Sequence, residues 1–441
     1  MDKQLEKRET KILARYKKVI KSFDKTWRVI DDTRVPILRE VLSWLDHPDT
    51  KLKIIQIAGT NGKGSTGAML GAVLKANGYT YGHFSSPFIM DDREQIRING
   101  EMITKHDFLT YYDQVVATFA AHGHAIDYLS YFEYLTVISL LAFVDNGVDI
   151  VIFEAGLGGL RDATNAIEVP MLTVFTKISI DHQNLLGHNI KEIADNKSAL
   201  IKSGTWVINY AGQDIDATKV LRARTEAVGA RWFEHKRDEI IILNTTPAGL
   251  DLSINGESGY FLSMSGAFQV HNFSIVLQIK AALIEKGMVF DRAKTKQGLA
   301  NVRILGRMNY HEDTNILFDA AHNVDGIRGL VSALNAWHLK IKPTLILGVL
   351  KDKDYHEMLD EIVPFVQRVI TVTPNNKTRA LSADELAADI LSDYPNIEVE
   401  VANDASAAIS LAMRVRESSK ALIVVTGSFY TLSAIHREGG I

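Results

Sequence analysis

Short runs of apolar and β-branched residues recur along the first half of the chain, separated by segments long enough for amphipathic helices. The runs are IIQIA (54–58), YTYGHF (79–84), DIVIFEA (149–155), MLTVFTKI (171–178) and WVINY (206–210). Short strands that alternate with helices pair in parallel through right-handed crossovers. The pattern therefore predicts an α/β domain built on a doubly wound, mainly parallel sheet.

The pattern changes near residue 240. Over residues 240–266, apolar and polar positions alternate with a period of two and turn residues interrupt them, which predicts a small antiparallel excursion. A second strand–helix series then comprises NILFDAAHN (315–323), PTLILGVL (343–350), RVITVTP (368–374), IEVEVAND (397–404) and ALIVVTGS (421–428). We place the domain boundary near residue 305, in RILGR, which gives α/β domains over residues 1–305 and 306–441.

Composition excludes several classes of protein. The 441 residues are 46% hydrophobic and 23% charged, the balance of a globular protein with large cores. The formal net charge of −4 provides no basic field for nucleic acid or anionic membranes. The absence of cysteine excludes disulfides, thiolate metal sites and a thiol nucleophile. The charged start and the short longest apolar run, VISLLAFV, predict a cytoplasmic protein without membrane or nucleic-acid partners.

A glycine-rich turn with one lysine, AGTNGKGS, follows the first predicted strand and precedes a helix of small residues. Backbone N–H groups of such a turn, the helix dipole and the lysine can bind phosphates, and a following hydroxyl can bind Mg²⁺. The usual pattern is G-x-x-x-x-G-K-[ST]; here Ile57 replaces its first glycine and an extra glycine follows the lysine. We predict phosphate binding rather than a plain strand–helix connection. The nucleotide-binding residues predicted here are Thr60, Asn61, Gly62, Lys63, Gly64 and Ser65.

Almost every predicted strand ends in small or polar residues, and ligands bind at the carboxyl ends of open parallel sheets. In the first series, Glu154 has the oxygen chemistry that suits Mg²⁺, whereas a solvated strand end is the plain alternative. Ser86 follows the run YTYGHF, and His182 lies in the loop after the run MLTVFTKI. The alternative for His182 is a hydrogen-bonded structural histidine, and the alternative for Ser86 is a turn residue. The residues alone leave these alternatives open.

The turn AGTNGKGS resembles the ATP-binding turn of the Mur ligase superfamily, specifically of folylpolyglutamate synthase and its dihydrofolate synthase relatives. The resemblance extends to about residue 435 through SSPF (85–88), FEYLT (132–136), EAGLGGLRDATN (154–165), DHQNLLGHNIKEIADNKSALIKSG (181–204), LGRM (305–308), DAAHNVDGI (319–327), LKDKD (350–354) and VVTGSFY (424–430). It implies a Mur-ligase-type, P-loop ATP-binding domain followed by a Rossmann-like C-terminal glutamate-ligase domain.

The same resemblance implies metal and catalytic roles. Ser86, Glu154 and His182 match metal ligands, two Mg²⁺ sites are typical, and Lys63, Lys197 and His182 match catalytic positions. Lys197 matches a lysine that is commonly carbamylated, which would turn a cation into an oxygen-bearing anion near Mg²⁺. The sequence departs from the family here, because Asn196 replaces a glutamate and Ser198-Ala199-Leu200 replaces alanine–glycine–isoleucine.

Four residues of the second half match ATP-contacting positions or motifs of the family: Asn272, Arg307, Asp319 and His322. From the residues themselves, an aspartate after a strand can accept from ribose hydroxyls and an arginine can bind phosphate with its planar fork. An asparagine amide can bind an adenine edge. Residues that depart from the family pattern nearby are Phe268, Asn309, Ala320 and Val324.

The resemblance implies an ATP- and Mg²⁺-dependent carbon–nitrogen ligase that acts as a monomer on ATP, L-glutamate and reduced folate. The expected product is a folylpolyglutamate, formed through an acyl phosphate. One alternative is a bifunctional enzyme that also glutamylates dihydropteroate; SSPF favours the folylpolyglutamate form, although Gln95 replaces the family's arginine. A cell-wall ligase would need more residues before the phosphate loop than are present. A non-catalytic ATP-dependent switch is the third alternative.

Overall fold

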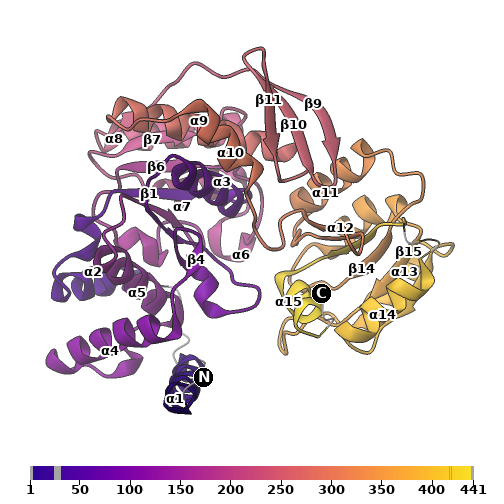
Figure 1. Cartoon of the computed structure of the whole chain (residues 1–441), viewed down its shortest axis with the longest axis horizontal. Helices are drawn as coiled ribbons and strands as arrows, with labels where there is room; N and C mark the ends of the chain where they lie inside the picture. The colour runs from indigo at the N-terminus through magenta and orange to yellow at the C-terminus, as the bar shows by residue number, and fades with distance from the viewer. Residues whose placement is uncertain (1–2, 24–30, 417, 419, 439–441) are drawn as a thin grey trace. The chain divides into compact units, whose positions relative to one another are not determined.

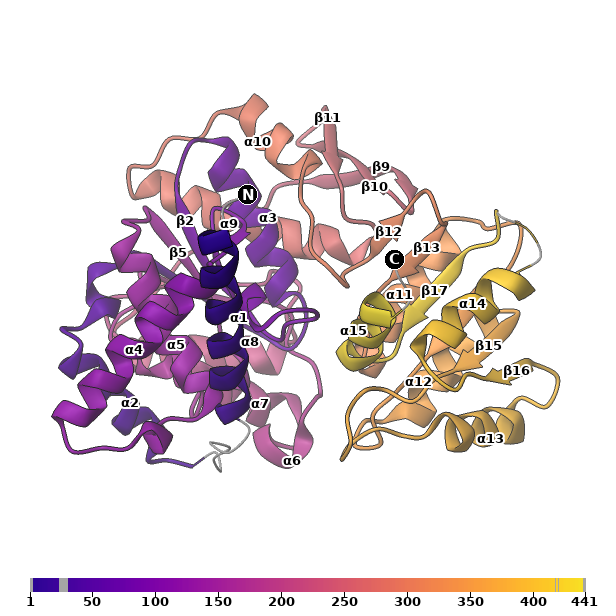
Figure 2. The same cartoon turned by 60° about the horizontal axis from the view of Figure 1, so that its bottom comes forward.

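The computed structural model describes residues 3–23, 31–416, 418 and 420–438, which Figures 1 and 2 show in two orientations. The chain divides into two compact units. The first unit comprises Met1–Pro87, Asp92–Lys236 and Gln278–Asp291, and the second comprises Phe88–Asp91, Arg237–Leu277 and Arg292–Ile441. The boundary near residue 305 stays a prediction, since this division places residues 237–277 and 292–305 with the second unit.

The first unit contains an eight-stranded sheet with the order β4-β3-β2-β5-β1-β6-β7-β8. Its strands are β1 (Ile54–Ala58), β2 (Tyr81–Phe84), β3 (Ile96–Ile98), β4 (Glu101–Met102), β5 (Ile150–Glu154), β6 (Leu172–Phe175), β7 (Trp206–Asn209) and β8 (Arg231–Trp232). From β2 to β8 all pairs are parallel, while β3 and β4 add an antiparallel edge. The central strands β1 and β5 are buried along their whole length, as mainly apolar strands of a sheet covered on both faces are, and this includes the polar residues Gln56 and Glu154.

Helices cover both faces of this sheet. Helices α1, α2, α4 and α5 share one apolar core with β5, and α7 and α8 share another with β6 and β7. Their bounds, with α3 and α6 and two short 3-10 helices, are α1 (Lys3–Phe23), α2 (Arg34–Trp44), η1 (Pro48–Lys51), α3 (Lys63–Ala76), α4 (Lys105–Ala121), α5 (Tyr131–Asp145), η4 (Ala163–Ala166), α6 (Gln183–Leu186), α7 (Ile190–Ser198) and α8 (Ile215–Ala227).

Local sequence signals fix several helix starts. Helix α4 begins with a capping box in which Thr104 and Asp107 satisfy each other's backbone N–H groups, and α5 begins with the same device from Ser130 and Glu133. Glu133 also accepts two hydrogen bonds from the Arg34 guanidinium, at 2.9 and 2.6 Å. Helix α5 is thereby tied to α2 through a charge-assisted pair.

The second unit contains a three-stranded antiparallel sheet, β11-β10-β9, and a six-stranded sheet, β12-β13-β17-β14-β15-β16. Only β12 is antiparallel in the latter. The strands are β9 (Ile240–Thr246), β10 (Gly249–Ile254), β11 (Glu257–Leu262), β12 (Asn309–His311), β13 (Ile316–Phe318), β14 (Thr344–Leu347), β15 (Arg368–Thr371), β16 (Glu398–Val401) and β17 (Ile423–Thr426). The helices, of which α9 spans both units, are α9 (Phe268–Glu285), α10 (Arg292–Ala300), α11 (Val324–Ala336), α12 (Tyr355–Ile362), α13 (Ala383–Asp393), α14 (Ala405–Val415) and α15 (Phe429–Glu438).

The predicted fold class is confirmed: a doubly wound parallel sheet, an antiparallel excursion and a second parallel α/β sheet follow each other along the chain. The sequence pattern missed β3, β4, β8 and β12, which have only two or three residues and are too short to show a period. Among the described residues, no helix is long and apolar enough to cross a membrane.

Candidate active site

The phosphate loop between β1 and α3 is held against the end of β6. Gly59 has φ +149°, and a Cβ atom there would lie 1.9 Å from the Thr176 hydroxyl oxygen, so glycine is required. The Thr176 hydroxyl donates to the Asn61 carbonyl at 2.8 Å, and the Thr60 N–H donates to the Lys177 carbonyl at 2.8 Å. The shape of the loop is therefore set by bonds to the neighbouring strand end.

The loop turns into α3 at Gly62, which has φ +89° and precedes the first helical residue, Lys63. Gly64 and Ser65 are buried in the first helical turn. The first N–H groups of a helix have no intrahelical acceptor, and they point out of its N-terminus. This start of α3 has the polarity that an anionic ligand requires.

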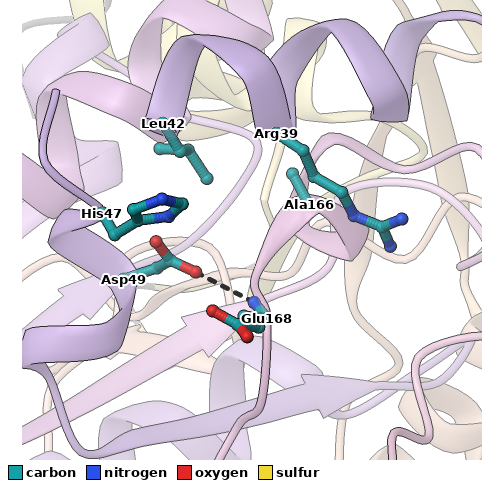
Figure 3. Close-up of a pocket in the computed structure, with 6 residues that line it drawn as sticks. All are labelled: Arg39, Leu42, His47, Asp49, Ala166 and Glu168. Carbon is teal, nitrogen blue, oxygen red and sulfur yellow. Dashed lines mark hydrogen bonds between the residues drawn. The ribbon is translucent and has the colours of Figure 1, made fainter. Parts of the chain in front are cut away.

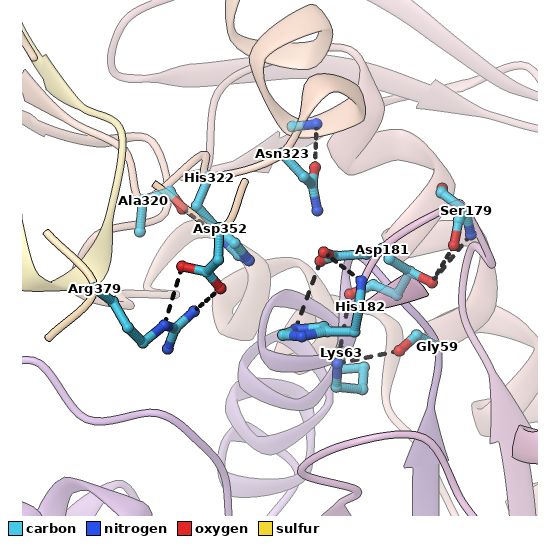
Figure 4. A network of polar contacts seen from close by, with 12 residues as sticks. Gly59, Lys63, Ser179, Asp181, His182, Ala320, His322, Asn323, Asp352 and Arg379 are labelled. Atoms are coloured by element: carbon cyan, nitrogen blue, oxygen red, sulfur yellow. Dashed lines mark hydrogen bonds and ion pairs between the residues drawn. The ribbon is translucent and has the colours of Figure 1, made fainter. Parts of the chain in front are cut away.

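Lys63 lies between the loop and the end of β5. Its Nζ donates to the Gly59 carbonyl at 3.1 Å (Figure 4). It also donates to the Thr60 carbonyl at 3.4 Å and lies 4.0 Å from Glu154 Oε1. The Glu154 side chain is only 3% exposed, whereas that of Lys63 is 16% exposed. Because β1 and β5 are adjacent parallel strands, the sheet brings this acid and this base to one edge.

Lys197 reaches the same loop from α7. Its Nζ donates to the Gly59 carbonyl at 3.0 Å, and the residue is 3% exposed. Burial, and next the positive charge of Lys63, lower the pKa of Lys197 to about 7, although Asp162 and Asp181 oppose the shift. Near pH 7 the amine is therefore divided between its neutral and charged forms.

Two acids beside Lys197, Asp162 and Asp181, did not emerge from the sequence. Asp162 is buried and accepts from the Leu157 N–H at 2.6 Å and from the Thr164 N–H and hydroxyl. Burial raises the pKa of Asp162, while these hydrogen bonds and the Lys197 charge oppose the shift. The one sequence feature that could have identified them is that Asp162 and Asp181 lie in the motifs EAGLGGLRDATN and DHQNLLGHNIKEIADNKSALIKSG. Neither spacing nor periodicity marks a buried acid.

Asn196 joins α7 to the glycines that follow Glu154. Its Oδ1 accepts from the Gly159 N–H at 3.0 Å. A Cβ atom on Gly159 would lie 2.8 Å from the Lys197 Cα, and one on Gly158 would lie 2.4 Å from the Asn196 Oδ1. The glycines therefore let this loop approach α7 closely, at the residue where the sequence departs from the family's glutamate.

The three predicted metal ligands lie at the ends of three strands of the first unit: Ser86 follows β2, Glu154 ends β5 and His182 follows β6. These strands lie close together in the sheet, in the order β2-β5-β1-β6. Glu154 is buried, Ser86 is half-buried, and His182 is exposed just before α6. His182 Nε2 lies 3.8 Å from Asp181 Oδ2 (Figure 4). Within the described ranges there is no group of three or more His, Cys, Asp or Glu side chains able to hold a metal. Carboxylate, hydroxyl and water oxygens are nevertheless the ligands that Mg²⁺ prefers, so this oxygen-rich donor set fits it.

In the second unit, Asp319 follows β13 and is buried. Its two carboxylate oxygens accept from the N–H groups of Met308 and Ala321, both at 2.9 Å. Burial raises the pKa of Asp319, opposed by the positive charge of Arg307 and by these two hydrogen bonds. The Arg307 guanidinium lies 4.8 Å from the centre of the Phe429 ring. Asp319 thus shapes the turn that carries Arg307.

The other two residues predicted to contact nucleotide lie on different elements. His322 Nδ1 lies 2.8 Å from the Ala320 carbonyl oxygen (Figure 4). On α9, the Asn272 amide donates to Gln269 Oε1 at 2.8 Å, and both residues are buried. Gln269 was not singled out in the sequence, yet it fixes the orientation of the Asn272 amide.

Strand β14 of the second unit is followed by the charged motif LKDKD (350–354). Both Asp352 oxygens accept from the Arg379 guanidinium, at 3.1 and 2.6 Å (Figure 4). Burial acts to raise the pKa of Asp352, but the hydrogen bonds and the positive charge of Arg379 together outweigh it, so this pKa is lowered. The Lys351 N–H also donates to the Arg379 carbonyl at 2.9 Å. The loop after β14 is therefore fastened to the segment after β15.

Both parts of the chain match domains of known Mur ligases. Residues 57–279 match the Mur ligase middle domain, and residues 306–429 match the Mur ligase glutamate ligase domain. The chain is 30% identical to the dihydrofolate synthase/folylpolyglutamate synthase of Bacillus subtilis, over 91% of this chain and 94% of that protein. It is 31% identical to the folylpolyglutamate synthase of Lacticaseibacillus casei, over 95% and 96%. The structure of Mycobacterium tuberculosis folylpolyglutamate synthase complexed with ADP superimposes with a TM-score of 0.88 and 28% identity, over 98% and 99% of the two chains.

Proposed function

Because the chain belongs to the folylpolyglutamate synthase/dihydrofolate synthase family of Mur ligases, which are ATP-dependent carbon–nitrogen ligases, we propose that it joins L-glutamate to the γ-carboxylate of a reduced folate. The product is a folylpolyglutamate. The observation that carries this proposal is the preformed phosphate loop, with the Lys63 ammonium 4.0 Å from the buried Glu154 carboxylate. The chain is proposed to act as a monomer.

The chemistry follows from the poor reactivity of a carboxylate toward an amine. A γ-carboxylate oxygen of the folate attacks the γ-phosphorus of ATP, the bond to the bridging oxygen breaks, and ADP leaves. The amine nitrogen of glutamate then attacks the acyl carbon, phosphate departs and the nitrogen loses a proton. No protein nucleophile is needed, so catalysis consists of positioning and charge neutralisation. Lys63 supplies a fixed positive charge beside the phosphates.

The donors for Mg²⁺ are proposed to be Glu154, Ser86 and His182, with Ser65 on the phosphate loop. When bound, the metal ions neutralise phosphate charge and the charge that develops during transfer. Glu154 has the burial and the negative charge that this role requires. His182 is the weakest donor of the set by chemistry, because imidazole is not a preferred ligand of Mg²⁺.

Lys197 is proposed to carry a carbamate. Its neutral amine nitrogen would attack the carbon of CO₂, forming an N–C bond and releasing one proton, and the product is an anion. The geometry supports this proposal because the amine is buried beside Lys63, and a second ammonium there is unfavourable. A carbamate would be attracted by Lys63 instead, and it would offer oxygen to Mg²⁺.

The second unit is proposed to contribute ATP contacts through Asn272, Arg307, Asp319 and His322. The Asn272 amide is oriented by its neighbour on α9, which suits recognition of a base edge. Arg307 has the planar fork that binds phosphate oxygens. Asp319 and His322 follow the carboxyl end of β13, where α/β folds bind nucleotides, Asn272 lies near the start of α9, and Arg307 lies just before β12.

The deciding experiment measures ADP release with and without L-glutamate, across tetrahydrofolate, its glutamylated forms and dihydropteroate. We expect ADP release to require both a folate and glutamate. Turnover of dihydropteroate as well would identify the bifunctional activity that the name of the Bacillus subtilis relative describes. ADP release that is independent of glutamate would contradict ligation and support the ATP-dependent switch.

A further inference from the structure

A separate cavity lies in the first unit between α2, the loop into η1 and the segment after η4 (Figure 3). Its volume is about 270 Å³, and it is lined by Arg39, Leu42, His47, Asp49, Ala166 and Glu168. None of these residues belongs to the phosphate loop or to the other parts of the proposed ligase site. Since water occupies about 30 Å³, the cavity has the volume of about nine water molecules, enough for a small organic ligand.

Asp49 gives this cavity an unusual chemical property. The residue is 4% exposed, and its Oδ2 accepts from the Glu168 N–H at 2.9 Å (Figure 3). Its Oδ1 has no hydrogen-bond partner in the part of the chain that the structure describes. A buried carboxylate oxygen without a donor is unfavourable. A ligand that brings an N–H⁺ group would remove this cost.

The remaining polar groups of the cavity define the rest of such a ligand. Arg39 is exposed, and one of its terminal nitrogens donates to the Asn165 carbonyl at 3.1 Å. A guanidinium has five N–H groups in a fork that matches a carboxylate. The Glu168 carboxylate is exposed on the same wall as the Asp49 carboxylate. Leu42 and Ala166 supply apolar surface in the same cavity.

We propose that this cavity binds an α-amino acid in its zwitterionic form. The ammonium lies between Asp49 Oδ1 and Glu168, the carboxylate pairs with Arg39, and a small apolar side chain packs on Leu42 and Ala166. A simple anion would meet two carboxylates, and a simple cation would meet a guanidinium. A divalent metal would need more oxygen ligands than the two acids provide. A ligand that carries both charges offers a partner to Asp49, Glu168 and Arg39 together, and His47 lines the same cavity.

Occupation of the cavity would also bear on the loop that follows β5. The cavity residues hold two points of this loop, through the Arg39 bond to Asn165 and the Asp49 bond to the Glu168 N–H. Asn165 in turn donates to the Leu160 carbonyl at 2.9 Å. A ligand bridging Arg39 and Asp49 would therefore restrain residues 160–168. The proposed site is a second amino-acid site that acts on this loop, distinct from the site of glutamate ligation.

The test is titration calorimetry of the full-length protein with L-alanine and L-leucine, which the ligase reaction does not use as a substrate in this proposal. We expect at least one of them to bind. Ethylamine and propionate, which each keep only one charge of alanine, should bind at least tenfold more weakly. Hydrogen exchange should slow in residues 160–168 when the amino acid is present, which locates the site independently of any substitution.

Variants test whether the amino acid binds in this cavity or elsewhere on the protein. Asp49→Asn and Arg39→Gln should each raise the dissociation constant at least tenfold. Arg8→Gln, which alters an exposed arginine of α1, should leave it unchanged, and so should Lys63→Ala in the phosphate loop. Arg39 is exposed, so its variant remains informative even if Asp49→Asn unfolds the protein. Absence of saturable binding by both amino acids would overturn the proposal, as would unchanged affinity in Arg39→Gln or protection of a different segment.

Discussion

Lys63 and Lys197 donate to the same acceptor, the carbonyl oxygen of Gly59, at 3.1 and 3.0 Å. Two ammonium groups that share one oxygen repel each other, and at ~4 Å with an effective dielectric near 20 the repulsion is about 4 kcal/mol. The protein reduces this cost by burying Lys197 fully, which favours its neutral amine, and by leaving Lys63 partly exposed. One lysine is therefore suited to remain a cation and the other to be modified.

Lys63→Ala should reduce ligation by about 10²-fold or more, because it removes a fixed charge beside the reacting phosphates. The fold should persist, since the side chain is partly exposed at the start of α3 and its removal leaves no cavity in the core. Steady-state ADP release and the melting temperature measure the two effects. Lys18→Ala, an exposed lysine of α1, is the matched control. Near-normal turnover in the folded Lys63 variant would eliminate the phosphate-binding role.

Lys197→Ala should be nearly inactive, and short carboxylic acids or bicarbonate should restore part of its activity by supplying the missing anion. Lys197→Arg should not be rescued, because the guanidinium keeps its positive charge and fills the site. Activity across a series of added acetate or bicarbonate concentrations tests this prediction. Intact mass of the native protein should show the added CO₂. An unmodified lysine together with an active arginine variant would contradict the carbamate.

The unmodified form of Lys197 should make stability depend on pH. Its pKa is about 7 in the folded protein against 10.5 as the reference, so the unfolded chain binds more protons between these values. Stability should therefore rise with pH across this window, by at most about 1.4 kcal/mol per pH unit.

Urea unfolding between pH 7 and 10, in bicarbonate-free buffer, measures the effect of Lys197 on stability. Lys197→Met, which keeps the length of the side chain but does not titrate, should lose this rise. If wild type and variant respond to pH in the same way, the buried lysine does not titrate as the structure indicates. Added bicarbonate should flatten the wild-type curve, because a carbamate no longer exchanges this proton.

Asp319→Ala should raise the KM for ATP more than the KM for folate, because the second unit is assigned to nucleotide binding. It should also destabilise the protein by about 1–3 kcal/mol, since the N–H groups of Met308 and Ala321 lose their acceptors. Initial rates with each substrate varied in turn separate the two KM values. Weakened folate binding with unchanged ATP dependence would show that the assignment of the units is reversed.

The sequence by itself indicated most of the strands and the glycine turn that leads into α3. Their signals are local: β1 coincides with the run IIQIA, and α3 begins at the lysine of the glycine turn. Alternation of strands and helices also implied parallel sheets, and hence which ends of the strands share an edge. Periodicity missed strands of two or three residues, and it gave no sign of which polar residues are buried.

Only the tertiary structure decided which of these residues meet. Lys197 is 138 positions from Gly59, and Asp49 is 119 positions from Glu168, yet each pair is hydrogen bonded. Burial, and the pKa shift that it causes, depends on how helices pack over the sheet rather than on neighbours in sequence. Nothing in the sequence marks Lys197 of α7 or Asp49 of η1 as buried. Packing lowers the pKa of Lys197 to about 7 and leaves Asp49 Oδ1 without a hydrogen-bond partner among the described residues.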